Sequence, residues 1–401
     1  MSIVHNTRDF INRYHGDDEL AKKFHGDALV WAKEERRLPL AYQEIEYVEA
    51  DGRQFFYTGV IWDKTIIVTD DVVYTSNASN NISGIYGGAY YGVNKGKWYI
   101  GGADGAAYTT NTEAKVLYDA STNTIYNSLT QVVVRPSSMS VTTENEFDFV
   151  LFSLANNSTG VETATYRNYC KRYQTTIYKD GECVRNFVPC YRKSDKKVGM
   201  FDTVNGVFYV SATSVDFIAG PVVECESLKY VANTNQNFIN THYKNTTSDI
   251  VSFKVERTGE IGGNSDYPRF YGKEIGNGTT GYVAGMIGRT YGKETRDFYY
   301  SSASSGYISS FTTNALVVEK TTPATVYFTN ELKELEFYVF TSNRYNFTIS
   351  FSNWYGRMYY LKCGDALNLV PYKIGSRVGM LNKVNGVLYT GEYLSKPFVA
   401  P

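Results

Sequence analysis

The sequence predicts an all-β protein, with two tandem antiparallel β-sandwich domains behind a short, partly helical N-terminal segment. Three observations predict this fold: a composition rich in Tyr and Gly, many short apolar stretches separated by turn residues, and sequence blocks that recur about 180 residues later. Tyr occurs 36 times and Gly 34 times among 401 residues. Tyr favours strands, and Gly supplies the positive φ angles of tight turns. The composition therefore favours strands joined by tight turns.

The N-terminal segment carries the helical signature. In residues 17–24 acidic side chains precede basic ones, and Leu20 and Phe24 are four residues apart, which predicts a short helix. The charged run at 33–37 is interpreted as a solvated linker. Because about 40 residues of this kind cannot form a core, we expect residues 1–40 to become ordered against the particle to which the chain attaches. The aromatic side chains available for this docking are Phe10, Tyr14, Phe24 and Trp31.

An internal repeat divides the rest of the chain into two units. Residues 187–209 read FVPCYRKSDKKVGMFDTVNGVFY, and residues 369–389 read LVPYKIGSRVGMLNKVNGVLY. Upstream, Tyr47-Val48 recurs as Tyr230-Val231 with nearly the same offset. Blocks that share one offset indicate a tandem duplication.

Each unit has the pattern of a sandwich or jelly roll, in which short strands alternate with Gly, Asn, Asp or Ser clusters. Asn205-Gly206 and Asn385-Gly386 are the strongest hairpin signals, and we expect type I′ turns there. The predicted strands include residues 66–68, 131–134, 147–152 and 175–178 in the first unit, and 249–255, 316–319 and 335–340 in the second.

The blocks also resemble a known family. Residues 46–59, EYVEADGRQFFYTG, and the closing stretch 187–221 are similar to the opening and closing blocks of tailed-phage structural proteins with concanavalin-like, laminin-G-like jelly-roll domains. The resemblance implies one lectin-like jelly roll at 41–224 and a second, diverged one at 225–401, where His242 replaces Gly59.

What the resemblance implies about function is a virion structural protein: a tail or head fibre, or an accessory component. Such a protein is made in the host cytoplasm and assembles with capsid, tail or fibre subunits and as a homo-oligomer. Two alternatives stay open. One is a carbohydrate-binding module that recognises a host-surface glycan, and the other is a glycan depolymerase.

Several function classes are disfavoured by composition. The formal charge of −1, from 40 basic and 41 acidic residues, argues against nucleic acid binding. No stretch approaches the roughly 18 apolar residues of a membrane span, so membrane insertion is not expected. Of the four histidines, His242 alone lies in a unit, so the first unit lacks a histidine for a catalytic triad. We therefore expect no enzyme and no cofactor.

No metal is expected either, although three groups of residues could supply ligands. Cys170, Cys183 and Cys190 are better interpreted as buried thiols than as ligands. The two His-Gly-Asp stretches at 15–17 and 25–27 are better interpreted as turns. Calcium stays open, because loop carboxylates leave little trace in one sequence. The candidate loops are Asp70-Asp71 and Asp104-Gly105.

A Gly/Tyr-rich stretch at 83–92 is the candidate contact surface. Exposed Tyr rings can stack on sugar rings, and the alternative is that the rings pack in the sheet or at a subunit interface. The charged residues Arg192, Lys193 and Asp195 are interpreted as a salt-bridged turn. The candidate glycan or interface residues are Tyr86, Tyr90, Tyr91, Trp98 and Tyr99.

Overall fold

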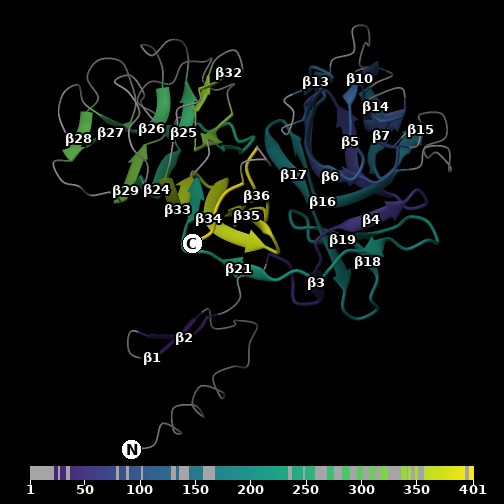
Figure 1. Cartoon of the computed structure of the whole chain (residues 1–401), viewed down its shortest axis with the longest axis horizontal. Coiled ribbons are helices and arrows are strands. Elements are labelled where there is room, and N and C mark those ends of the chain that lie inside the picture. Colours follow the sequence, from purple (N-terminus) through teal and green to yellow (C-terminus); the bar gives the residue numbers. More distant parts are fainter. Residues whose placement is uncertain are drawn as a thin grey trace, which may run out of the picture.

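The chain folds into strands, and no helix occurs among the residues that the structure describes (Figure 1). Two bodies of sheet lie side by side, which we call the first unit (residues 37–224) and the second unit (residues 225–401). The computed structural model describes residues 22–25, 28–32, 37–77, 81–86, 90–100, 103–127, 132–134, 144–156, 168–233, 237–246, 249–257, 269–274, 282–289, 296–300, 307–311, 317–323, 336–340, 342–344, 348–350, 356–392 and 397–401.

The N-terminal segment contains a two-stranded antiparallel sheet, β1 (Lys22–His25) and β2 (Ala28–Ala32). The helix predicted over 17–24 is therefore wrong at its end, because Lys22 and Lys23 pair with Ala32 and Trp31. The strand-forming sequence of β2 offers a pairing partner that the helical pattern did not take into account. Residues 17–21 lie outside the described residues.

One large sheet and two smaller ones form the first unit, and nearly all their pairs are antiparallel. The large sheet follows the order β13 (Val132–Val134), β12 (Thr124–Asn127), β11 (Glu113–Asp119), β6 (Ile66–Tyr74), β16 (Tyr169–Lys179), β17 (Glu182–Arg192), β18 (Val198–Asp202) and β19 (Val207–Val210), with β3 (Tyr42–Glu44), β4 (Val48–Asp51) and β20 (Ile218–Ala219) alongside. The smaller sheets are β10 (Ala103–Ala107), β9 (Lys97–Ile100), β8 (Tyr90–Asn94), β7 (Asn81–Tyr86) and β15 (Leu154–Asn156), and the pair β14 (Glu144–Leu151) and β5 (Phe56–Asp63).

The second unit repeats the strand order of the first. Its β29-β24-β33-β34-β35-β36 corresponds to β11-β6-β16-β17-β18-β19. These strands are β29 (Val317–Pro323), β24 (Ile250–Arg257), β33 (Gly356–Cys363), β34 (Leu367–Ile374), β35 (Arg377–Asn382) and β36 (Leu388–Tyr389), with β21 (Cys225–Ser227) and β22 (Val231–Asn233) alongside. Its other sheet contains β23 (Ile239–Asn240), β30 (Tyr338–Val339), β25 (Arg269–Glu274), β26 (Tyr282–Arg289), β27 (Arg296–Tyr300), β28 (Tyr307–Phe311), β31 (Ser342–Arg344) and β32 (Thr348–Ser350).

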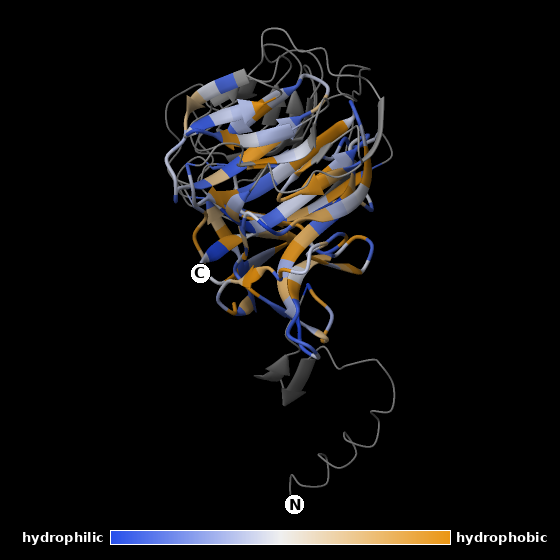
Figure 2. Cartoon of the chain, turned by 90° about the vertical axis from the view of Figure 1, so that its right-hand side faces the viewer, coloured by the Kyte–Doolittle hydropathy of each residue, from blue (hydrophilic) through white to orange (hydrophobic). Residues whose placement is uncertain are grey.

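The core of the first unit lies between its sheets. Tyr118 from the large sheet stacks on Trp62 and on Tyr91, with ring centroids 5.5 Å apart in both pairs. Phe149 stacks on the same two rings from the other side of the core. Along β5 and β11 buried residues alternate with more exposed ones, as half-buried strands require. Figure 2 shows this alternation as apolar and polar bands along the strands.

The hairpins that close the two units match residue by residue. Pro189 lies opposite Met200, and Pro371 lies opposite Met380. A Cβ on Gly199 would come within 2.0 Å of the Tyr209 carbonyl oxygen, and a Cβ on Gly379 within 2.2 Å of the Tyr389 carbonyl oxygen. Both positions therefore require glycine, because the next strand passes directly over them.

The two closing turns are equivalent, but they are not of the predicted type. Gly206 N–H donates to the Asp202 carbonyl, and Gly386 N–H donates to the Asn382 carbonyl, each at 2.8 Å. Each Gly has positive φ, +69° and +74°, whereas Asn205 is not among the residues with positive φ. A type I′ turn needs positive φ at both central residues. The loop is instead four residues long, and the Asp202 carboxylate accepts the Val204 N–H within it.

The units also share two backbone kinks. Phe152 and Phe340 have φ of +66° and +65°, and Gly59 and His242 have +69° and +54°. Positive φ is uncommon for residues other than Gly. The backbone therefore has the same local conformation at His242 as at Gly59, although positive φ is unfavourable for a residue with a side chain.

Candidate functional site

The aromatic residues nominated as a contact surface are mostly inside the first unit. Tyr91 and Trp98 are fully buried in its core, and Tyr90 is 7% exposed. Tyr99 is half-buried and packs beside Tyr90, with ring centroids 5.9 Å apart. The side chain of Tyr86 lies outside the described residues. Three of the four described rings are therefore buried in the sheets, and the fourth, Tyr99, is half-buried.

The nominated docking residues belong to the N-terminal segment. Phe10 and Tyr14 lie outside the described residues, and Phe24 and Trp31 are described only as backbone in β1 and β2. In the part of the chain that the structure describes, no helix is long and apolar enough to cross a membrane.

Cysteines and acidic residues form no metal centre in the described part of the chain, where no group of three His, Cys, Asp or Glu side chains is placed to bind an ion. Burial raises the pKa of Cys170, Cys183 and Cys225 to about 12, so these thiols stay protonated and unreactive. The salt bridge predicted between Arg192 and Asp195 is present at 2.5 Å.

The most elaborate polar site in the described chain is the contact between the two units, which we call the seam. At its centre the side-chain amide of Gln174, on β16, meets the edge strand β36. Its Oε1 accepts the Leu388 N–H at 3.2 Å, and its Nε2 donates to the Leu388 carbonyl at 3.3 Å. One side chain of the first unit thus satisfies both outward-facing backbone groups of Leu388 in the second unit.

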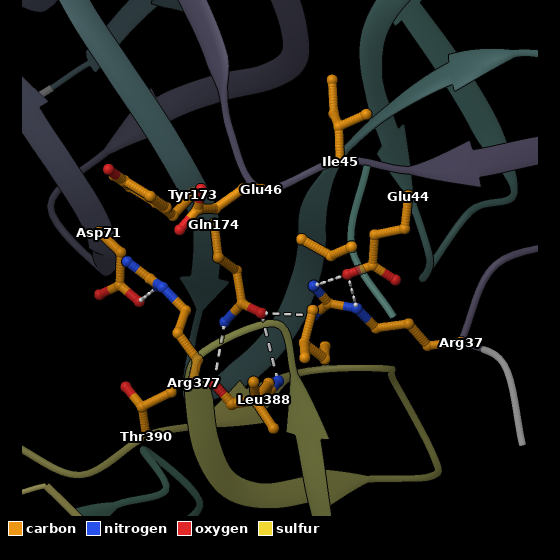
Figure 3. A pocket seen from close by; sticks show the side chains of 12 residues that line it. Arg37, Glu44, Ile45, Glu46, Asp71, Tyr173, Gln174, Arg377, Leu388 and Thr390 are labelled. Atoms are coloured by element: carbon orange, nitrogen blue, oxygen red, sulfur yellow. Dashed lines mark hydrogen bonds and ion pairs between the residues drawn. The ribbon is translucent and has the colours of Figure 1, made fainter. Parts of the chain in front are cut away.

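Arg37 ties the start of the first unit to this seam (Figure 3). Its guanidinium pairs with Glu44 at 2.5 Å and donates to Gln174 Oε1 at 2.8 Å, and more weakly to the Gly386 carbonyl at 3.4 Å. The side chains of Arg37 and Glu44 are only 4% and 5% exposed. The expectation that residues 33–37 form a solvated linker is therefore wrong for Arg37, because buried carbonyl, amide and carboxylate oxygens surround it; residues 33–36 lie outside the described chain.

Arg377 makes the reverse connection from the second unit to the first. Its guanidinium pairs with Asp71 at 2.9 Å and with Glu113, and lies 4.1 Å over the Tyr173 ring. Burial raises the pKa of Glu113, and the charge of Arg377 opposes this effect. A desolvated cation that has both carboxylates and an aromatic face as partners gives a directional contact.

Further contacts extend the seam on both sides. The Asn385 carbonyl accepts from Asn186 at 3.2 Å and from Thr203 at 2.5 Å, so the two closing turns touch. Lys115 donates to the Gly391 carbonyl at 3.0 Å. Tyr178 lies against the His242 ring, 4.7 Å between centroids, and its hydroxyl is 3.3 Å from that of Tyr389.

The seam contains a partly open pocket of about 10 Å³, which the side chains in Figure 3 line. A space of this size holds no more than about one water molecule. Its arginines already have carboxylate partners within the chain. The arrangement therefore suits the fixing of two units at one angle, and it has no room for a sugar or a cofactor.

A second polar cluster is buried between the sheets of the first unit. Arg172 and Asp70 are both 0% exposed and are 3.2 Å apart. Asp70 accepts from Thr175 at 2.7 Å and from Tyr91 at 3.1 Å, and Arg172 donates to Ser83 at 2.7 Å. Burial raises the pKa of Asp70, while Arg172 and the two hydroxyls oppose this shift. The cluster is closed to solvent.

The structure also places the acidic residues that the sequence suggested as calcium ligands. Asp70 and Asp71 lie within strand β6, and each already has an arginine partner, Arg172 and Arg377. Asp104 is exposed and lies 3.4 Å from Lys97. Asp70 and Asp71 therefore do not form an exposed calcium loop.

Sequence reasoning missed the residues that build the seam and the buried cluster. Arg37 was assigned to a linker, and Gln174, Arg377 and Arg172 were not singled out. One signal could have found Arg172: in an alignment of the two repeats it stands where the second unit has Met358, which marks a charge in an apolar position.

Comparisons with protein-family models, with curated proteins and with solved structures found no match to this chain.

Proposed function

We propose that this chain is a non-enzymatic structural protein of a tailed-phage particle, in which the N-terminal segment attaches to the particle and two lectin-like jelly rolls project from it. The observation that carries the proposal is the way the chain enters the body of the protein. Arg37 joins the N-terminal segment to both units at once, through Glu44 and Gln174 and the Gly386 carbonyl. A load that reaches Arg37 is thus passed to both units.

The matched strand orders support the tandem jelly-roll architecture. The packing of Leu38 moves the boundary of the proposed attachment segment. Leu38 is 7% exposed and packs with Val188, Cys190 and Phe201, so the residues from Arg37 onward belong to the first unit. The attachment segment is therefore residues 1–36 and not 1–40.

The alternative of a carbohydrate-binding module loses support, because the four described rings nominated for it are buried or half-buried. A glycan depolymerase would need a carboxylate pair in an open cleft. In the described residues, the carboxylates at the seam surround a pocket of only about 10 Å³.

The experiment is a pair of truncations. Removing residues 1–36 should leave the melting temperature of the purified chain unchanged, while the truncated chain is missing from purified particles. Removing residues 1–38 should lower the melting temperature, because Arg37 and Leu38 are then lost. A chain lacking residues 1–36 that still incorporates at the normal level would contradict the attachment function.

A further inference from the structure

The closing hairpins of the two units are alike in structure but differ in exposure. In the second unit, Val387 is 2% exposed and belongs to the apolar core of that unit, and Thr390, which lines the seam, is 9% exposed. In the first unit, the equivalent Val207 on β19 is 44% exposed and Val210 is 37% exposed. β19 is also the last strand of its sheet. The first unit thus presents to solvent the hairpin surface that the second unit buries.

The edge of β19 has the same outward-facing groups as the edge of β36. Asp202 and Val207 flank the turn, and Phe208, opposite Phe201, is the next residue of the ladder. Hydrogen-bonded pairs alternate along an antiparallel ladder. By its correspondence to Leu388, opposite Leu381, Phe208 directs its N–H and carbonyl away from β18.

The face that receives the hairpin is also present twice. In the first unit, Tyr47 packs edge-on against Tyr173 at 5.5 Å, and Lys171 lies 4.6 Å over Tyr47. The second unit repeats this arrangement. Tyr230 packs against Tyr359 at 5.7 Å, and Arg357 lies 4.6 Å over Tyr230.

The two receiving faces differ in what covers them. In the first unit, Arg377 of the docked hairpin lies over Tyr173 beside Asp71. In the second unit, Tyr359 is half-buried, and its hydroxyl donates to Glu256 at 2.6 Å. Glu256 thus stands beside the second tyrosine, whereas the position of Asp71 is taken by Lys254, which lies 5.8 Å over the Tyr359 ring.

We propose that a second copy of this chain docks the β18–β19 hairpin of its first unit on the Tyr230–Tyr359 face, and so repeats between chains the contact that the seam makes within one chain. Lys197 stands where the second unit has Arg377, two residues before the essential glycine. Its ion pair with Asp216 is about half-exposed and contributes little. Lys197 can therefore leave Asp216 at small cost and approach Glu256, which it would share with Arg357, while the like charge of Lys254 over Tyr359 weakens this contact.

The contact is weaker than the seam. At the position of Gln174 the second unit has Tyr360, whose hydroxyl can donate or accept but cannot satisfy two backbone groups as an amide does. The contact is head-to-tail, so it joins copies into a ring or an open chain, and it does not form a two-fold dimer. We expect reversible association that strengthens with concentration.

The test is the oligomeric state of the full chain, measured by analytical ultracentrifugation over a range of concentrations. The native chain should associate, whereas Val207→Asp and Tyr359→Ala should each shift the association at least tenfold to higher concentration. Ile61→Asp is the matched control, since Ile61 is 46% exposed on β5 and belongs to neither surface. Far-ultraviolet circular dichroism shows whether each variant is folded.

Mixing the two defective variants sharpens the test. Each retains one intact surface, so an equal mixture of Val207→Asp and Tyr359→Ala chains should form a one-to-one dimer that neither forms alone. A native chain that stays monomeric at all concentrations overturns the proposal, whatever else binds that face. Association that both variants retain, or a mixture that stays monomeric, overturns it as well. Particle attachment through residues 1–36 is unaffected by any of these outcomes.

Discussion

Equivalent core positions carry charged and polar side chains in the first unit and apolar side chains in the second. Between the sheets of the first unit lies the buried group Asp70, Arg172 and Thr175. Strand pairing places Phe253, Met358 and Leu361 at the equivalent positions of the second unit, and all three are 0% exposed. One unit thus holds an ion pair where the other holds three apolar side chains.

This difference shows which features set the strand order. Both units keep the close-approach glycine, the turn glycine and the Pro–Met pairing, although their core chemistry differs. The backbone requirements are therefore shared, and the buried ion pair is an addition of the first unit. Burying two charges is costly unless hydrogen bonds satisfy them. Thr175 and Tyr91 donate to the Asp70 carboxylate, whereas Nε and Nη1 of Arg172 are buried without a hydrogen-bond partner in the described structure.

The largest expected effect comes from breaking the pair on one side. Arg172→Met leaves the Asp70 carboxylate buried without its cation, which should cost about 3–5 kcal/mol of the free energy of unfolding. Urea unfolding followed by tryptophan fluorescence measures it, because Trp62 and Trp98 are buried in the first unit. Met358→Leu is the control at the equivalent position of the second unit and should cost less than about 1.5 kcal/mol. Equal losses in the two variants would remove the distinction between the cores.

A smaller effect, shared by the two units, is expected at the glycines. Gly199→Ala and Gly379→Ala both place a methyl group against a backbone carbonyl, and each should cost about 1–3 kcal/mol. Hydrogen exchange followed by mass spectrometry should show faster exchange in the altered unit only. Gly206→Ala is a useful contrast, because nothing lies within 4 Å of its Cβ position and its cost comes from φ alone. A cost at Gly199 without one at Gly379 would argue against equivalent hairpins.

Periodic patterns and turn residues predicted much of the fold. The all-β class is confirmed, and the strand expected at residues 66–68 lies inside β6, as that at 175–178 lies inside β16. The hairpins at Asn205-Gly206 and Asn385-Gly386 also formed where expected. These features depend on local backbone preferences, which a single sequence records directly.

The seam could not be predicted in this way. Gln174 and Leu388 are far apart in the sequence, and a Gln in a strand carries no sign of the backbone groups that it will meet. Arg37 ends a charged run, which usually marks a solvated segment, and its burial depends on Glu44 and on the docked second unit. Such contacts arise from the packing of preformed units, so residue patterns do not show them.

One pH effect belongs to the second unit, where His242 replaces Gly59 and contacts Glu336. Burial alone would raise the pKa of Glu336, but the His242 imidazole and the hydrogen bonds from His242 and Asn240 outweigh it, so its pKa is lowered. The stability from this carboxylate is present above its unfolded pKa of about 4.3. It is lost as the pH falls through the lower folded value.

Thermal unfolding between pH 7 and pH 3 measures this effect. Glu336→Gln should reduce the acid-induced drop in melting temperature, and the difference between the two proteins should disappear at the lowest pH. An identical pH profile for both proteins would show that Glu336 does not contribute.

The most direct test of the claim that one framework serves both units is to give the first unit the core residues of the second. The account predicts that the triple variant Asp70→Phe, Arg172→Met and Thr175→Leu folds cooperatively, with a free energy of unfolding closer to that of the native chain than Arg172→Met alone, because replacing a complete buried ion pair by apolar residues is often neutral. Urea unfolding of the native, single and triple variants provides the comparison. A triple variant that is no more stable than the single variant, or that fails to fold, would contradict the account.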